Sequence, residues 1–175
     1  MLYSVSILAV TETWLTPLIY DSSVFINNFS IYRSDSPTGI AKHGVCIYVR
    51  NYIKYTAVPC DIPNSLTIHL TQFDVYVTLV YRPPSNSHAD NVQLINFIYN
   101  FCYSKEIILL GDFNLPTINW SVDSPTTIYM NSNDKLFFDC FVSLGLNQWV
   151  EEHTFPTSGS ILNLLSGPFL GIGNI

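Results

Sequence analysis

Short apolar runs, each closed by a polar or proline-containing break, divide the chain into strands and helices. Val45–Arg50 (VCIYVR) is rich in β-branched and aromatic residues, which favours a strand. Leu66–Leu70 alternates apolar and polar positions like a half-buried strand, and Val75–Tyr81 follows after a polar break. The two segments therefore predict an antiparallel hairpin. The prolines at 83 and 84 end the second strand, because proline cannot donate to a sheet ladder.

Further strands are predicted toward both ends of the chain. Ser4–Val10 is a short apolar run that leads into the polar residues 11–13, and Ile161–Leu165 is a last short apolar run. Ile107–Leu110 is compact and wholly apolar, which predicts a central strand covered on both faces.

Two segments show helical periodicity instead. A helix is expected to begin near Asp90, because apolar residues then recur at i, i+3, i+4 and i+7: Leu94, Phe97, Ile98 and Phe101. Asp134–Leu144 presents a second apolar stripe, and Gly145 is a natural C-terminal stop. Strands packed face to face with outer helices predict an α/β fold. We expect a two-sheet α/β sandwich of mostly antiparallel strands, formed by residues 1–175 as one domain.

Composition narrows the class of protein. Hydrophobic residues make up 48% of the 175 residues and charged residues 11%, which excludes a disordered chain. Mean hydropathy is +0.26, yet no run of roughly 18 residues lacks polar breaks, so no membrane span is expected. The apolar start has no basic flank, which argues against a secretion signal and leaves a nuclear or cytoplasmic location expected.

Charge and cysteine usage give weaker indications. The net charge of −6 provides no general basic footprint for nucleic acid. Four of the seven basic residues cluster in one stretch, which forms either a phosphate-facing strip or a solvated face: Arg33, Lys42, Arg50 and Lys54. The cysteines are widely spaced and never form CxxC, so reduced, mostly buried thiols are expected rather than a zinc site: Cys46, Cys60, Cys102 and Cys140.

Polar clusters follow three apolar runs: Glu12, Tyr81 with Arg82, and Asp112 with Asn114. If the strands are neighbours, their ends present these groups to a shared cleft. Carboxylates bind a hard cation or orient a water, while an amide and a phenol hydrogen-bond a phosphate. Each residue also has a plain alternative. Glu12 fits a solvated acid, Tyr81 a packing group, and Asp112 and Asn114 an Asx-turn.

Four segments in order resemble a known family. Thr11–Leu15 resembles an "ET-W" motif, 80–84 a "YRPP" motif, 109–114 a "GDFN" signature, and 43–49 a glycine-led strand. The family is the apurinic-endonuclease-like domain that accompanies reverse transcriptases in non-LTR retrotransposons. It belongs to the endonuclease/exonuclease/phosphatase superfamily. The likeness spans about residues 5 to 166.

The resemblance implies a reaction and roles in it. Glu12 would bind Mg²⁺ or Mn²⁺, and Asp112 would orient or activate the attacking water. Asn114 would hold the phosphate or position that water, and Tyr81 would contact the scissile phosphate. The implied reaction is hydrolysis of a DNA phosphodiester, which leaves a 3′-hydroxyl and a 5′-phosphate. The implied partners are DNA and, within a longer polyprotein, a reverse transcriptase domain.

The chain departs from the family pattern in three places. The family's first strand, which ends in an asparagine, is expected to be missing, as is the closing "SDH" strand with its histidine. Asn163 replaces an aspartate in an "ILDLV"-like segment. His43, His69 and His88 are interpreted as surface or strand positions, and His153 as a loop residue. Losing partners from a coupled constellation lowers the rate by on the order of a thousandfold, so impaired nuclease activity is expected.

Two alternatives stay open. One is that the chain is a catalytically dead remnant, which folds partly and binds nucleic acid or nothing. A lipid or sugar phosphatase of the same superfamily is the other alternative. The direct passage from YRPP into a helix, with no long insertion, favours the DNA-acting branch over it.

Overall fold

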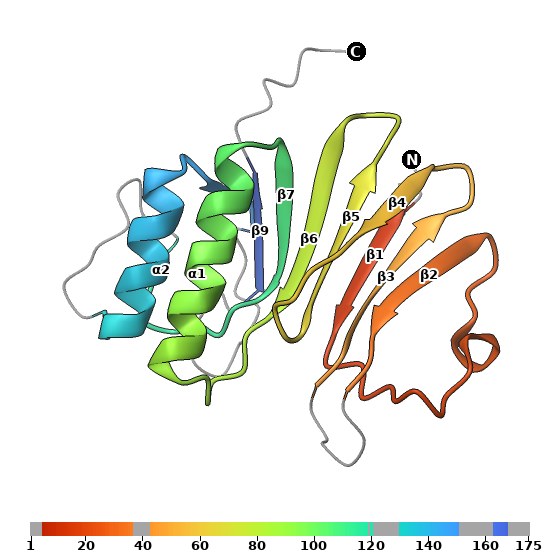
Figure 1. Ribbon diagram of the computed structural model, residues 1–175, viewed down its shortest axis with the longest axis horizontal. Coiled ribbons are helices and arrows are strands. Elements are labelled where there is room, and N and C mark those ends of the chain that lie inside the picture. Colours follow the sequence, from red (N-terminus) through yellow and green to blue (C-terminus); the bar gives the residue numbers. More distant parts are fainter. Residues whose placement is uncertain (1–4, 37–42, 119, 121–129, 151–162, 168–175) are drawn as a thin grey trace. The chain divides into compact units, whose positions relative to one another are not determined.

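The chain forms two compact units, Met1–Tyr81 and Arg82–Ile175, in the computed structural model (Figure 1). The structure describes residues 5–36, 43–118, 120 and 130–150, and the backbone of 163–167. The described elements of the N-terminal unit follow in chain order: β1 (Ile7–Thr11), the 3-10 helix η1 (Asp21–Val24), β2 (Phe29–Ser34), β3 (Val45–Arg50), β4 (Tyr55–Val58), β5 (Ser65–Leu70) and β6 (Val75–Tyr81). Those of the C-terminal unit are α1 (His88–Tyr103), β7 (Ile107–Asp112), α2 (Ser132–Ser143), β8 (Asn147–Gln148) and β9 (Asn163–Gly167).

The N-terminal unit is a sandwich of antiparallel strands. One layer has the order β1-β3-β2, and β4-β5-β6 form the other. β3 contacts both β5 and β6 across the interface. Its apolar residues are buried, as are their counterparts on β5 and β6: Val45, Ile47, Val49, Ile68, Val77 and Leu79. Burial of this apolar surface is the main force that holds the layers together. The predicted β5–β6 hairpin is confirmed.

The expected half-burial of the 66–70 strand is wrong. Thr67 and Thr78 face each other in the β5–β6 register and are 0% and 1% exposed. Their hydroxyl oxygens are 3.1 Å apart, so each supplies the other's hydrogen-bonding need inside the sandwich. A polar residue at an alternating position is therefore compatible with burial, although His69, the other polar residue of the 66–70 strand, stays partly exposed.

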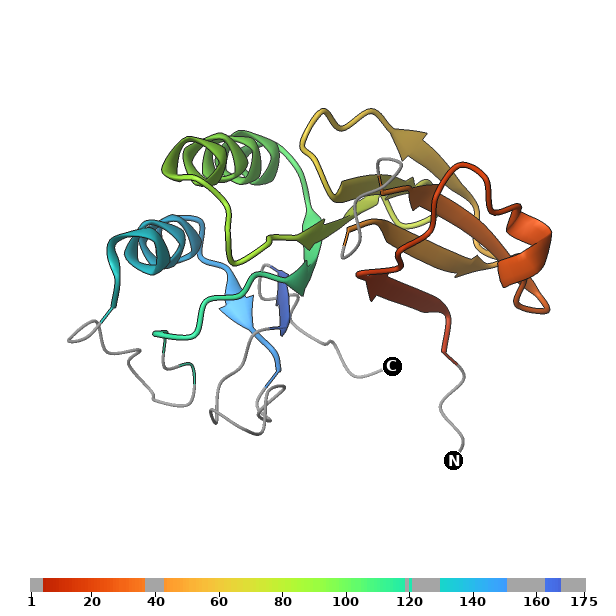
Figure 2. The same ribbon diagram turned by 90° about the horizontal axis from the view of Figure 1, so that it is seen from below.

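The C-terminal unit combines helices with antiparallel strands in the order β7-β9-β8. In Figures 1 and 2, α1 and α2 lie side by side on one side of β7 and β9. On β7, Ile107 and Leu109 are buried, whereas Ile108 and Leu110 are partly exposed. The expected cover on both faces is therefore confirmed in part: one face of the strand is buried and the other is partly buried. In the core of this unit, three aromatic rings pack edge-on against one another: Phe113, Phe137 and Phe141.

Both predicted helices are confirmed, with ends fixed by capping groups. Ser87 and Asp90 form a reciprocal capping box, so α1 begins earlier than the acidic residue suggested. The C-terminus of α2 forms a Schellman motif, in which Gly145 N–H donates to Val142 O and Leu146 N–H to Phe141 O. Gly145 has φ +64°, the left-handed conformation that the predicted stop requires.

The fold class is the predicted one: α/β, with two sheets of mostly antiparallel strands in a sandwich and, in the described part, two helices. Among the described residues, no helix combines the length and apolar character that crossing a bilayer requires.

Candidate functional site

Glu12 and Tyr81, far apart in sequence, meet in the N-terminal unit. Glu12 directly follows β1 and is exposed, while Tyr81 is the last residue of β6 and is 5% exposed. The Tyr81 hydroxyl donates a hydrogen bond to Glu12 Oε1. Two of the residues predicted for phosphoryl chemistry therefore form a carboxylate–phenol pair at the end of two strands.

The backbone corner after β1 is tightly fixed around Glu12. Glu12 has φ 52° and Trp14 φ 55°, left-handed conformations that are uncommon for residues other than glycine. Thr13 N–H donates to Gly44 O (3.1 Å) and Trp14 N–H to His43 O (3.0 Å). Gly44 itself has φ +90°, and a Cβ there would lie 2.6 Å from Thr13 Oγ1. The close approach of Gly44 thus holds the corner that presents Glu12.

Sequence reasoning missed two neighbours of this pair, His43 and Asn64. The His43 ring lies edge-on to the Tyr81 ring, with centroids 6.4 Å apart. Its Nδ1 is 3.2 Å from Asn64 Oδ1, which also accepts from Gly44 N–H at 3.4 Å. The Asn64 carbonyl accepts from Tyr81 N–H at 2.8 Å. The sequence predicts a surface or strand position for His43. Its place beside Gly44, in the glycine-led segment, is the sequence feature that could have indicated a position near Glu12 and Tyr81.

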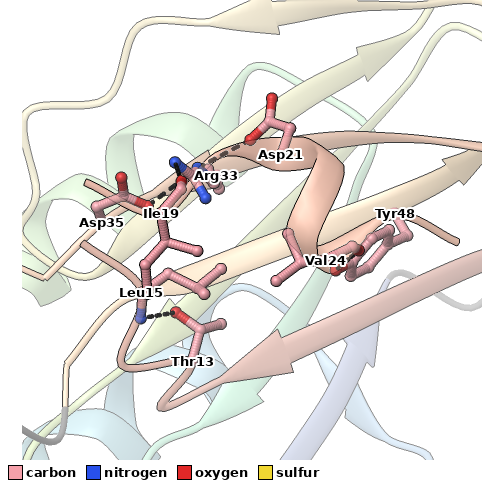
Figure 3. Close-up of polar contacts among 8 residues, drawn as sticks. All are labelled: Thr13, Leu15, Ile19, Asp21, Val24, Arg33, Asp35 and Tyr48. Atoms are coloured by element: carbon pink, nitrogen blue, oxygen red, sulfur yellow. Dashed lines mark hydrogen bonds and ion pairs between the residues drawn. The ribbon is translucent and has the colours of Figure 1, made fainter. Parts of the chain in front are cut away.

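The loop that follows Glu12 is tied to the β1-β3-β2 sheet by Arg33 (Figure 3). Arg33 Nε forms ion pairs with Asp21 (3.1 Å) and Asp35 (3.2 Å). Its Nη2 donates to Ile19 O at 2.5 Å. With 16% of its side chain exposed, Arg33 serves local structure, which speaks against its membership of a phosphate-facing strip. Arg50 likewise packs over the Phe29 ring, at 4.3 Å from its centroid.

Asp112 and Asn114 lie together in the C-terminal unit, at the end of β7. Asn114 N–H donates to Asp112 Oδ1 at 3.0 Å, which is the Asx-turn that the sequence allowed. Asn114 has φ 48° and its Nδ2 donates to Arg82 O at 2.9 Å. The turn therefore uses part of the hydrogen-bonding capacity of both side chains for structure, while both stay partly exposed.

Arg82, the second residue of the YRPP segment, lies beneath this turn; the sequence places it beside Tyr81 in a polar cluster but gives it no role. It is 4% exposed, and its Nη1 donates to the carbonyls of Phe113 (2.9 Å) and Asn114 (2.8 Å). Its Nε donates to Asn91 Oδ1 on α1 at 2.8 Å. Burial lowers the pKa of the Arg82 guanidinium, and the charges of Asp134 and Asp112 oppose that shift.

The position where the family pattern has an aspartate lies beside this turn. In the antiparallel β7–β9 register, Asn163 is directly opposite Asp112. The backbone thus retains the pairing, while the sequence supplies an amide instead of a carboxylate. His153 lies outside the described residues.

A metal ion would find few ligands prearranged. Among the described residues, no group of three His, Cys, Asp or Glu side chains is placed to hold one. Glu12 is an exposed carboxylate, and carboxylate oxygens are ligands that Mg²⁺ prefers.

The cysteines are free thiols, as predicted, and burial raises the pKa of Cys102 to about 12 and of Cys140 to about 11.

Comparisons with known proteins agree with this architecture. A family described as endonuclease-reverse transcriptase matches residues 75–166, just over half of the chain. No curated protein matches the sequence.

Solved structures share the fold at low sequence identity. The endonuclease domain of TRAS1, a telomere-specific non-LTR retrotransposon, superposes with a TM-score of 0.62 at 13% identity, covering 82% of this chain and 67% of that one. The AP endonuclease LMAP from Leishmania major gives 0.67 at 11% identity, with 94% and 70% covered. The catalytic domain of Xenopus laevis APE2 gives 0.56 at 14% identity, with 94% and 74% covered.

Proposed function

Because the chain belongs to the endonuclease-reverse transcriptase family, we propose that it acts on DNA and hydrolyses phosphodiester bonds. The observation that carries the proposal is the family match over residues 75–166, which includes Tyr81, Asp112 and Asn114. The shared fold with AP endonucleases and a retrotransposon endonuclease supports the same class of reaction. Within a longer polyprotein, the partner would be a reverse transcriptase domain.

The proposed roles follow the chemistry of each group. Glu12 would hold Mg²⁺, with Mn²⁺ as a substitute, and Tyr81 would both orient the Glu12 carboxylate and contact the phosphate. Once bound, the cation would stabilise negative charge on the phosphoryl oxygens. The Tyr81 hydroxyl donates to one Glu12 oxygen and so restricts the carboxylate. The side chain then loses less conformational freedom when a ligand binds.

Asp112 and Asn114 are proposed to act on the attacking water. Asp112 accepts a proton from the water or orients it, and Asn114 positions the water or the phosphate. Two hydrogen bonds support these roles, because the Asn114 backbone N–H restrains the Asp112 carboxylate and the Arg82 carbonyl restrains the Asn114 side-chain amide. Asn163 lowers the activity in this proposal, since an amide opposite Asp112 cannot take up a proton or pair with an imidazolium.

Plasmid nicking in Mg²⁺ tests the proposal. We expect weak nicking that Asp112→Ala abolishes and that Asp139→Ala leaves unchanged. Asp139 is a matched control, because it is an exposed acid whose contact is the Lys135 pair on α2. Nicking that survives Asp112→Ala would contradict the proposed role of Asp112.

The second candidate function is nucleic-acid binding without hydrolysis, favoured specifically by the amide at position 163. Absence of nicking at every Mg²⁺ and Mn²⁺ concentration, together with retention of labelled DNA in a gel-shift assay, would select this function. Because nonspecific DNA binding weakens steeply with salt, the gel shift is run at two salt concentrations.

A further inference from the structure

Arg82 is a buried cation that the proposed reaction leaves without a role. It is 4% exposed, and its guanidinium donates to neutral oxygens, namely two backbone carbonyls and the side chain of Asn91. Removing a charge from water is costly, and a buried charge is rarely the most stabilising choice for a core position. A buried arginine that contacts neutral acceptors instead fixes where those acceptors lie.

The acceptors that it fixes belong to the Asp112–Asn114 turn. Nη1 holds the consecutive carbonyls of Phe113 and Asn114, at 2.9 and 2.8 Å. Two carbonyls that converge on one nitrogen restrict the peptide between them, and Asn114 adopts the left-handed φ of 48° there. The backbone N–H of Arg82 also donates to Asp112 O at 2.8 Å, so the arginine contacts every residue of the turn.

The contact is reciprocal and anchored on both helices. Asn114 Nδ2 donates to the Arg82 carbonyl at 2.9 Å, which closes a ring of hydrogen bonds between the two residues. Nε reaches Asn91 on α1, and the guanidinium lies 5.3 Å from the ring centroid of Phe137 on α2. The planar guanidinium of arginine supplies N–H donors in several fixed directions and stacks on an aromatic face. The lysine ammonium group does neither in the same way, so lysine is not an equivalent substitute.

We propose that Arg82 is the positioning residue of the Asp112–Asn114 turn: its guanidinium sets the backbone of residues 112–114, and through it the side chains of Asp112 and Asn114. The proposal deepens the proposed function, since it takes its interest from the roles given to those two residues. Its geometric content is independent of nuclease activity.

Amide hydrogen exchange, read residue by residue by NMR on the whole chain, tests the proposal without requiring hydrolysis. The variants are Arg82→Met, Arg82→Lys and the control Arg50→Met. Arg50 is a matched control, because it also donates to a backbone carbonyl and lies over an aromatic ring, but in the N-terminal unit. The reporters are the amides of Asn114 in the turn, Ile98 in α1 and Phe141 in α2.

The expected result is local. In Arg82→Met, exchange of the Asn114 amide accelerates about tenfold or more, while the Ile98 and Phe141 amides change much less. Arg82→Lys gives an intermediate acceleration, and Arg50→Met leaves Asn114 unchanged.

Three results would overturn the proposal. Equal acceleration at all reporters would show that Arg82 contributes general packing. Unchanged exchange at Asn114 would show that the Asx-turn holds itself. If Arg82→Met does not fold, Arg82→Lys decides; failure of that milder variant to fold would show that Arg82 supports the whole unit and not the turn. If the unmodified chain does not nick plasmid DNA, that separate result would count against the proposed function and not against the role of Arg82.

Discussion

Replacing Gly44 by alanine tests the corner that presents Glu12. Gly44 has φ +90°, and the added Cβ would lie 2.6 Å from Thr13 Oγ1 and 3.2 Å from the backbone nitrogen of Ser36. A Cβ essentially never lies within 3.0 Å of another heavy atom, so the contact with Thr13 Oγ1 cannot persist, and the Ser36 nitrogen must also yield by a few tenths of an ångström. Thr13 Oγ1 accepts from Leu15 N–H at 3.3 Å, and that bond is disturbed when Thr13 moves.

The destabilisation has two parts. The left-handed conformation of an alanine costs roughly 1–2 kcal/mol. Forcing extra volume into a filled position costs typically 1–3 kcal/mol. We therefore expect Gly44→Ala to lower the free energy of unfolding by about 2–5 kcal/mol, a large fraction of the stability of a typical domain.

Gly145→Ala separates the two parts. Gly145 also has a positive φ, +64°, but an added Cβ there meets nothing within 4 Å. It should lose only the backbone part, roughly 1–2 kcal/mol. Urea unfolding followed by circular dichroism gives both values, and the slope of each transition checks that the same surface is exposed. Equal losses in the two variants would refute the steric argument at Gly44.

Other predictions address the site and the thiols. Asn163→Asp places a second carboxylate opposite Asp112 in the β7–β9 register, so we expect a loss of about 0.2–1 kcal/mol of stability without divalent cation. Added Mg²⁺ should recover that loss if the two carboxylates share the ion; thermal melts with and without Mg²⁺ decide, and a melt insensitive to Mg²⁺ argues against a shared ion. The pKa of Cys102 is raised from 9.0 to about 12 by burial, with the charge of Cys140 as a smaller contribution. A raised thiol pKa stabilises the fold below pH 9, and that stabilisation is lost as the pH rises from 9 toward 12. Urea midpoints across that interval should therefore fall, and alkylation of Cys102 at pH 8 should be much slower than that of a free thiol; rapid alkylation of the folded chain would contradict the burial argument.

The sequence predicted those elements whose ends carry local chemical signals. β3 and β6 have the predicted bounds, and the second is closed by the prolines at 83 and 84. The acidic residue alone predicts a start of α1 near Asp90, whereas its capping partner Ser87 sets the start of the helix at His88. A capping box is a local pattern, so this boundary was available from the sequence.

The remaining features depend on contacts between distant residues. Thr67 was assigned to a solvated face because the pattern does not show that Thr78 satisfies its hydroxyl across the hairpin. Asn64 enters the Glu12–Tyr81 neighbourhood only through its contacts with His43 and Tyr81. The role of Arg82 was equally hidden, since its acceptors follow it by about thirty positions in the chain. Motif order predicts which residues take part in the chemistry, but it does not predict which residues position them.

Glu12 and Asn114 share a backbone conformation that glycine adopts more easily than they do. The simplest substitution that relaxes the chain at either position is therefore the one that deletes the side chain to which we assign a role in the proposed reaction. The strain is greater at Glu12, because asparagine tolerates left-handed geometry better than glutamate. Laboratory evolution for heat resistance alone would favour glycine there and erase the carboxylate, so any screen for robust variants needs a simultaneous selection on ligand binding.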